Sequence, residues 1–165
     1  MRVWILVLAS CGRIQFDPVD VSACSGAGLV CADSVTAVTC NGRCWAWCHD
    51  LVDHAQAVAR CTAWGGTLMP LSTVADAACF RTTVVPTDSP WLGLEQASSS
   101  PAADVGWSWN GDGLPLDYTR WDSTQPDDGN GGVEIGHEQC VRARDGTADW
   151  FDVQCSDSYI VACAQ

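Results

Sequence analysis

Residues 125–155 read QPDDGNGGVEIGHEQCVRARDGTADWFDVQC. The Asp- and Gly-rich first half, taken alone, is typical of a solvated, turn-rich surface loop. The second half contains two short strand-like segments, QCVRA and DWFDVQC, which carry Cys140 and Cys155. Residues 104–152, which include the loop, hold eleven of the twenty acidic residues in the chain. The stretch therefore predicts an acidic loop followed by two cysteine-bearing strands.

The chain before and after this stretch divides into helices and then strands. Residues 53–64, DHAQAVARCTAW, predict a helix because Asp53 can cap it, Gln56 sits at the capping-box position and two glycines follow. The same cap spacing at Thr73 predicts a shorter helix at about 73–82. Strand and turn signals follow in PWLGLEQ, WSWNGDGLPLDYTRW and YIVACA. Two helices followed by several short strands predict an α+β domain.

The composition excludes several classes of function. A formal net charge of -12 gives a surface that repels phosphate backbones, so nucleic acid is not expected as a partner. All eight basic residues are arginine, which removes Schiff-base chemistry and the phosphate-loop lysine. The three histidines are scattered and lack zinc-site spacing. Eleven cysteines in 165 residues indicate an oxidising compartment and a disulfide framework.

The N-terminus explains the odd number of cysteines. Residues 1–10, MRVWILVLAS, have a basic start and an apolar run, and together with Cys11 they resemble a bacterial lipoprotein signal peptide cut before the cysteine. A lipid on Cys11 would anchor an exported protein to a membrane and leave ten cysteines for disulfides. Gly12 behind it favours the outer membrane. The alternative is a buried first strand with a free Cys11.

Residues 11–39 are expected to form a lipid-anchored tether, because they are rich in small and polar residues without a helix or strand period. The alternative is an irregular segment clipped by disulfides. Cys24 and Cys31 bracket a Ser-Gly-Ala-Gly loop and could pair with each other. The folded domain is then expected over residues 40–165.

Several motifs in residues 40–165 resemble, in order and spacing, the C-type lectin-like domain. Along the chain they are Cys61, Gly65, Gly66 and Leu68; Trp91, Leu92, Gly93 and Leu94; Trp107, Trp109, Gly113 and Trp121; Gln125, Pro126 and Asp127; Glu138, Gln139 and Cys140; Trp150, Phe151, Asp152 and Cys155; and Cys163. Each motif is weak alone, whereas the ordered set is specific. The resemblance implies a disulfide-stabilised α+β fold in which two helices pack on short antiparallel sheets and a long irregular loop carries the binding site.

The resemblance also implies two disulfides. Cys61 would pair with Cys163 and tie the first helix to the last strand, and Cys140 would pair with Cys155 at the base of the loop. The first bond closes a loop of about a hundred residues, for which the chain-entropy estimate is roughly 4 to 5 kcal/mol. The remaining pairs stay open, with a short N-terminal hairpin bridge and one further bridge expected among Cys40, Cys44, Cys48 and Cys79.

A calcium-dependent sugar site is a further implication of the resemblance. The calcium ligands and sugar-binding residues carried over by position are Gln125, Asp127, Glu138 and Asp152, which offer the hard oxygen atoms that calcium prefers. In calcium-binding members the bond before Pro126 is cis, and two adjacent sugar hydroxyls complete the shell of the ion. The Gln-Pro-Asp order resembles that of galactose-type members. A glycan or glycoprotein is thus the expected partner and calcium the expected cofactor.

Two departures from the family pattern leave alternatives open. Phe151 stands where the family carries an asparagine ligand, so calcium affinity should fall unless Glu134 or water fills the position. The loop also lacks the aromatic residue that usually stacks on galactose. The alternative is a calcium-independent protein-binding or adhesive module with Phe151 on its binding face. An enzyme is not expected, although Asp127 and Glu138 could be imagined as a glycosidase pair, because GxSxG, HExxH and phosphate-loop motifs are missing.

Overall fold

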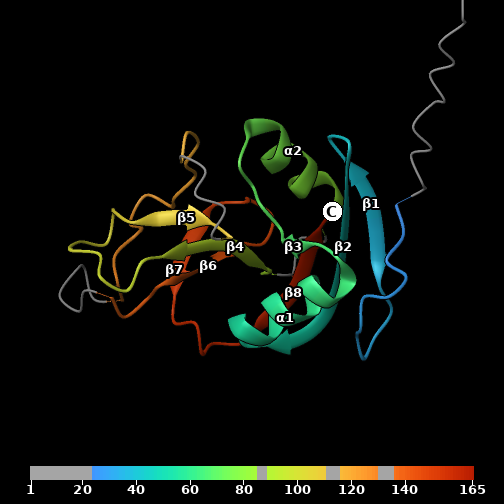
Figure 1. Cartoon of the computed structure of the whole chain (residues 1–165). Helices are drawn as coiled ribbons and strands as arrows, with labels where there is room; N and C mark the ends of the chain where they lie inside the picture. The colour runs from blue at the N-terminus through green and yellow to red at the C-terminus, as the bar shows by residue number, and fades with distance from the viewer. Residues whose placement is uncertain (1–23, 85–88, 111–115, 130–135) are drawn as a thin grey trace, which may run out of the picture.

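The computed structural model describes residues 24–84, 89–110, 116–129 and 136–165 (Figure 1). The predicted leader at residues 1–10, the predicted lipid site at Cys11 and the substitute ligand Glu134 lie outside the described residues. In chain order the elements are β1 (Thr36–Cys40), β2 (Arg43–Val52), α1 (His54–Trp64), β3 (Thr67–Leu68), α2 (Val74–Thr83), β4 (Trp91–Gln96), β5 (Trp107–Trp109), β6 (Cys140–Ala143), β7 (Trp150–Val153) and β8 (Tyr159–Ala164). Neither described helix is long and apolar enough to cross a membrane.

Two antiparallel sheets of four strands form the domain. The first sheet has the order β1-β2-β8-β3 and therefore joins the start of the described chain to its end. Cys44 and Gln165 exchange two backbone hydrogen bonds at 3.1 and 2.9 Å beside this sheet. The second sheet has the order β5-β4-β6-β7 and lies beside the first, with β6 and β7 at the side away from β1 (Figure 1). The predicted α+β architecture is confirmed.

The two helices begin and end where the sequence predicts. The Asp53 carboxylate accepts a hydrogen bond from the backbone N–H of Gln56 at 2.8 Å, and Gly65 ends α1 with a left-handed φ of 92°. The hydroxyl of Thr73 caps α2 in the same way by accepting from the N–H of Asp76 at 3.0 Å. Both capping predictions are confirmed, because short polar side chains satisfy N–H groups that the first turn of a helix leaves without partners.

Tryptophan side chains fill much of the core. Trp45, Trp47, Trp91 and Trp150 are fully buried. Trp150 makes edge-on contacts with Trp109 and Trp121, at centroid distances of 5.4 and 5.5 Å. Packing of this kind stabilises aromatic pairs beyond the burial of their area. Trp150 therefore anchors β7, the strand that also carries Asp152, in the core.

Five disulfides connect the described residues. Cys61–Cys163 and Cys140–Cys155 are present, so both predicted bonds are confirmed. The possible pairing of Cys24 with Cys31 is wrong. The bonds involving the other cysteines are Cys24–Cys44, Cys31–Cys48 and Cys40–Cys79.

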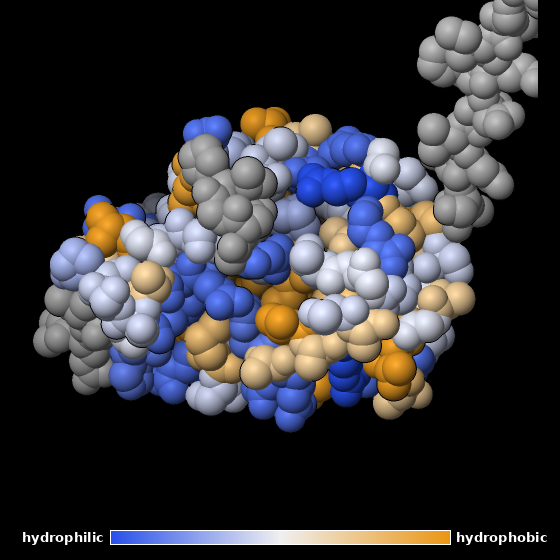
Figure 2. Space-filling model, viewed as in Figure 1, coloured by the Kyte–Doolittle hydropathy of each residue, from blue (hydrophilic) through white to orange (hydrophobic). Residues whose placement is uncertain are grey.

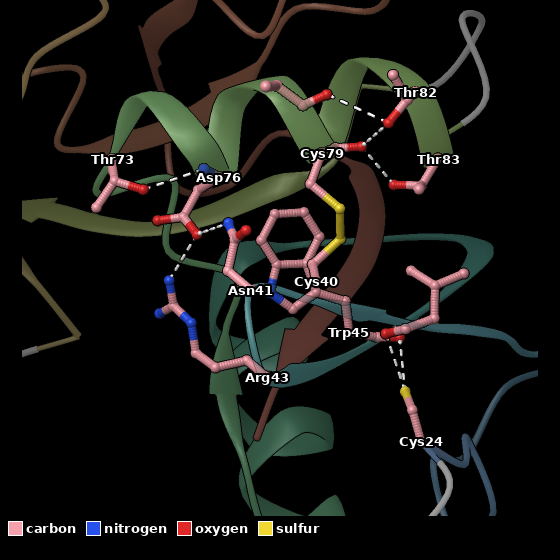
Figure 3. The surroundings of a disulfide bond; sticks show 12 residues. Cys24, Cys40, Asn41, Arg43, Trp45, Thr73, Asp76, Cys79, Thr82 and Thr83 are labelled. Carbon is pink, nitrogen blue, oxygen red and sulfur yellow. Dashed lines mark hydrogen bonds and ion pairs between the residues drawn. A yellow bond between two sulfur atoms is a disulfide. The ribbon is translucent and has the colours of Figure 1, made fainter.

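The physical reason is the path of residues 24–35, which run against β2. Cys44 and Cys48 both lie on β2, an even number of residues apart, so they face the same side of the strand and each takes one cysteine of that segment. The expected hairpin bridge is also wrong, since Cys40 at the end of β1 is bonded to Cys79 in α2 (Figure 3). Residues 24–39, part of the segment predicted as a tether, are thus linked to β2 by two disulfides and contribute most of β1, which agrees with the alternative of a disulfide-clipped segment.

The surface carries both hydrophilic and apolar regions. In Figure 2, hydrophilic residues gather over the part of the molecule that carries β4, β6 and β7, and small apolar residues lie along the side of α1. The most exposed large apolar side chains among the described residues are those of Val30, Leu51, Val74 and Val105.

Candidate functional site

Three of the four predicted ligand residues converge at the end of the second sheet. The carboxylates of Asp127, Glu138 and Asp152 each offer an oxygen, and these oxygens lie within 4.8 Å of one another. They come from three places in the chain: Asp127 from the loop, Glu138 from the segment that enters β6, and Asp152 from β7. The Cys140–Cys155 disulfide fixes the strands on which the last two depend. A cluster of this kind is a candidate cation site, since three carboxylates this close repel unless a positive charge neutralises them.

The fourth predicted ligand, Gln125, precedes Pro126, and the bond between them is cis, as the resemblance implies. Its backbone N–H donates to the carbonyl oxygen of Asp122 at 3.0 Å. Its side-chain Oε1 is buried and has no hydrogen-bond donor among the described residues. A buried amide oxygen without a partner costs free energy, and a cation is a partner that would satisfy it.

The carboxylate of Asp152 also holds the backbone of the loop. The side chain is 3% exposed. Its oxygens accept hydrogen bonds from the N–H of Asp127, at 3.0 and 3.2 Å, and from the N–H of Asp128 at 2.8 Å. Burial raises the pKa of Asp152 above its ordinary value, although these backbone N–H groups act in the opposite direction. Three of the roughly four lone-pair positions of the carboxylate are therefore in use.

Glu138 is the most perturbed acid of the cluster. Burial comes first among the causes, followed by the charges of Asp152 and Asp127, and together they raise its pKa from 4.5 to about 7. Gly129 packs against this side chain, since a Cβ at Gly129 would lie 3.2 Å from the carboxyl carbon of Glu138. Near neutral pH the carboxyl group is thus poised to hold either a proton or a metal ion.

Phe151 does not enter the carboxylate cluster. It is adjacent to Asp152 on β7, so the two side chains point to opposite faces of the sheet. The ring lies beneath the guanidinium groups of Arg142 and Arg144, with distances of 4.7 and 5.3 Å from the central carbon to the ring centroid. Arg142 also lies 5.3 Å from the ring of Tyr159. The residue that replaces the expected asparagine therefore leaves the space beside Asp152 free of its ring.

Asp128 is a residue of the site that the sequence did not single out. It is fully buried, and its carboxylate accepts hydrogen bonds from the backbone N–H groups of Gly136 at 2.8 Å, His137 at 3.1 Å and Glu138 at 3.1 Å. The Asp-Gly pair that it forms with Gly129 signals a turn. Its partners lie eight to ten residues farther along the chain, at a separation that no local pattern reveals.

Other candidates from the sequence belong to the core. His54 is buried, stands edge-on to Trp91 at a centroid distance of 5.0 Å, and has Nε2 3.4 Å from the carbonyl oxygen of Leu92. Burial lowers the pKa of His54. Trp107 packs against Trp121 at 4.9 Å. These side chains support the sheet that presents the carboxylates.

Comparisons with known proteins point to one family. A family model for the lectin C-type domain matches residues 52–165. No match is found among curated proteins.

The fold is similar to several solved structures. The human scavenger receptor C-type lectin carbohydrate-recognition domain is 23% identical, with a TM-score of 0.68 over 78% of this chain and 95% of that chain. A calcium-independent type II antifreeze protein is 25% identical, with a TM-score of 0.62 over 86% of this chain and 98% of that one. The cow C-type carbohydrate-recognition domain of CD23, solved in the presence of a GlcNAc2Man3 oligosaccharide, is 21% identical, with a TM-score of 0.63 over 82% of this chain and 95% of that one.

Proposed function

The chain belongs to the C-type lectin domain family, and on that premise we propose that it binds carbohydrate at a calcium ion held by Gln125, Asp127, Glu138 and Asp152. The observation that carries the proposal is the convergence of three carboxylates within 4.8 Å. The buried Oε1 of Gln125, without a donor among the described residues, supports it. Such a set of hard oxygen atoms suits calcium, which takes six to eight of them.

The side chains of the proposed site have different roles in sugar recognition. A bound calcium ion supplies coordination positions for two adjacent hydroxyls of a sugar. The carboxylates of Asp127 and Glu138 accept hydrogen bonds from those hydroxyls, and the amide of Gln125 donates one. The order of amide and acid around Pro126 supports a galactose-type arrangement of the two hydroxyls. Galactose-bearing glycans or glycoproteins are therefore the proposed partners.

Retention on immobilised sugars tests this proposal. We expect the protein to bind galactose resin in calcium and to elute with a chelator. The double substitution Gln125→Glu and Asp127→Asn exchanges amide and acid, so it should lower retention on galactose at least about tenfold, which corresponds to ~1.4 kcal/mol, and favour mannose. Asp145→Asn, a change at an exposed residue of the β6–β7 turn, is the matched control. A wild-type protein that binds neither sugar in calcium would rule the proposal out.

A second candidate function is a calcium-independent protein-binding or adhesive module. It is favoured by the carboxylate of Asp152, which already accepts three hydrogen bonds from backbone N–H groups. The aromatic and basic face formed by Phe151, Arg142 and Arg144 offers a surface for a protein partner. Binding of a partner that persists in chelator and is lost in Phe151→Ala would support this function over the lectin.

The proposed location is outside the cytoplasm, on a membrane. The five disulfides among the described residues support an oxidising compartment. The leader at residues 1–10 and a lipid on Cys11 would place the domain on a bacterial outer membrane. Mass spectrometry of the native protein should then find an acylated Cys11 and no peptide from the leader. An intact Met1 in membrane-extracted protein would contradict the anchor.

A further inference from the structure

Two buried carboxylates interlock the loop around the proposed ion site. Asp152 accepts from the backbone N–H groups of Asp127 and Asp128, which fixes the outgoing side of the loop. Asp128 then accepts from the N–H groups of Gly136, His137 and Glu138, which fixes the returning side. The loop is thus held to β7 through one chain of hydrogen bonds that starts at Asp152 and ends at the backbone of Glu138.

We propose that Asp128 is a positioning residue that holds Glu138 beside Asp127 and Asp152 before any ion or sugar is bound. This inference rests on the proposed function of the same site. Repulsion among three close carboxylates acts to drive the Glu138 segment away from β7. Hydrogen bonds from N–H groups to a charged acceptor are about twice as strong as those between neutral groups, and three of them oppose that movement.

The contacts of Asp128 argue against a direct role as a ligand. Its Oδ1 accepts from two N–H groups, those of His137 and Glu138, and its Oδ2 accepts from that of Gly136. The side chain is 0% exposed. Both lone pairs of Oδ1 are therefore in use, and Oδ2 points to the backbone of the returning segment. Asp128 acts on the site through the backbone of Glu138.

The control for this proposal is a second buried aspartate far from the loop. Asp76 in α2 is 1% exposed and also accepts from three donors, the side chains of Arg43 at 2.8 Å, Asn41 at 3.1 Å and Ser72 at 3.3 Å. Figure 3 shows Asp76 with Arg43 and Asn41 beside the Cys40–Cys79 disulfide. Replacing either aspartate with asparagine removes a charge and one acceptor oxygen from a satisfied, buried site. Both variants should lose stability, but only Asp128→Asn should affect the loop.

The first measurement uses metal-free protein in chelator and does not depend on calcium. Amide hydrogen exchange, followed by NMR, should show protection at Gly136, His137 and Glu138 in the wild type. In Asp128→Asn, exchange at these three amides should be at least about tenfold faster, as expected when local opening becomes easier by ~1.4 kcal/mol. In Asp76→Asn they should keep wild-type protection. Fast exchange at these amides in the wild type, or unchanged exchange in Asp128→Asn, would overturn the inference.

The second measurement separates positioning from simple support of the fold. Calcium titration by calorimetry should give a dissociation constant at least about tenfold weaker for Asp128→Asn and a wild-type constant for Asp76→Asn. Wild-type affinity in an Asp128→Asn protein that has lost its amide protection would overturn the positioning role. A wild type that binds no calcium would refute the proposed function, and the exchange data alone would then decide whether Asp128 holds Glu138. If Asp128→Asn does not fold, Asp128→Glu takes its place with the same two readouts.

Discussion

At the scale of single residues, the site brings function and stability into conflict at Glu138. Its carboxyl group lies with those of Asp127 and Asp152, and its pKa is raised from 4.5 to about 7. The folded protein therefore takes up a proton more readily than the unfolded chain between these two pH values. The metal-free protein loses stability from this group as the pH rises through that window, because ionisation costs more in the folded state.

Glu138→Gln should relieve this cost. A pKa shift of this size corresponds to roughly 3 kcal/mol of stability for a group fully shielded from water. Because the Glu138 side chain is partly open to water, we expect the variant in chelator at pH 8 to be more stable than the wild type by about 1 kcal/mol. The difference should shrink as the pH falls below about 7 and vanish near pH 4, where both side chains are neutral. Urea denaturation across this pH range measures it. A metal-free variant less stable than the wild type at pH 8 would contradict the interpretation of the cluster.

The residues of this site were predictable to different degrees. The order of the Gln-Pro-Asp triplet, Glu138 and Asp152 in the sequence predicts the ligand set, and the structure brings the three acids together. Asp128 was not predictable, because its partners are backbone N–H groups that every residue carries. The orientation of Phe151 was not predictable either, since it depends on which face of β7 packs under Arg142.

At the scale of helices and strands, close approaches between backbone segments decide how the elements pack. The C-terminus of α1 leads through Gly65 and Gly66 directly into β3, which pairs with β8. A Cβ at Gly66 would lie 2.3 Å from the carbonyl oxygen of Ala164. That atom belongs to the backbone of β8 and cannot move aside without breaking the sheet. Gly66 is therefore required by the close approach of α1 to the last strand.

Gly66→Ala should be strongly destabilising. We expect a loss of at least about 2 kcal/mol in the free energy of unfolding, because the added methyl group forces the α1–β3 junction away from β8. Thr67→Ala at the next, exposed position is the control and should change stability by no more than about 0.5 kcal/mol. Chemical denaturation of both variants provides the measurement. Equal stability of Gly66→Ala and the wild type would show that the α1–β3 junction accommodates the methyl group, which would contradict this prediction.

The helices were more predictable from the sequence than the disulfides that connect the segments of the chain. Capping residues mark the starts of α1 and α2 locally and a glycine marks the end of α1, so both helices follow from the sequence. Disulfides depend on which strand faces which segment. The bonds from Cys24 and Cys31 to β2 follow from the path of residues 24–35 over the first sheet, and that path has no local signature.

At the scale of the whole molecule, the disulfides connect the proposed ion site to the rest of the domain. Cys61–Cys163 joins α1 to β8, and Cys140–Cys155 clamps β6 to the segment after β7. The N-terminal bonds attach residues 24–35 to β2, the neighbour of β8. The acidic loop is thus the part of this region that is held mainly by hydrogen bonds. Binding of an ion there should therefore increase the free energy of unfolding.

Thermal unfolding in calcium and in chelator tests the central claim most directly. An ion that binds only the native state should stabilise it by about 2.7 kcal/mol at a calcium concentration 100 times Kd, and each kcal/mol raises Tm by about 2 to 4 °C in a protein of this size. We expect the Tm of the wild type to rise in millimolar calcium, to fall back on addition of chelator, and to stay constant in Asp127→Ala, which removes the ligand oxygen of this side chain. An identical Tm in calcium and in chelator for the wild type would contradict a calcium site at Gln125, Asp127, Glu138 and Asp152.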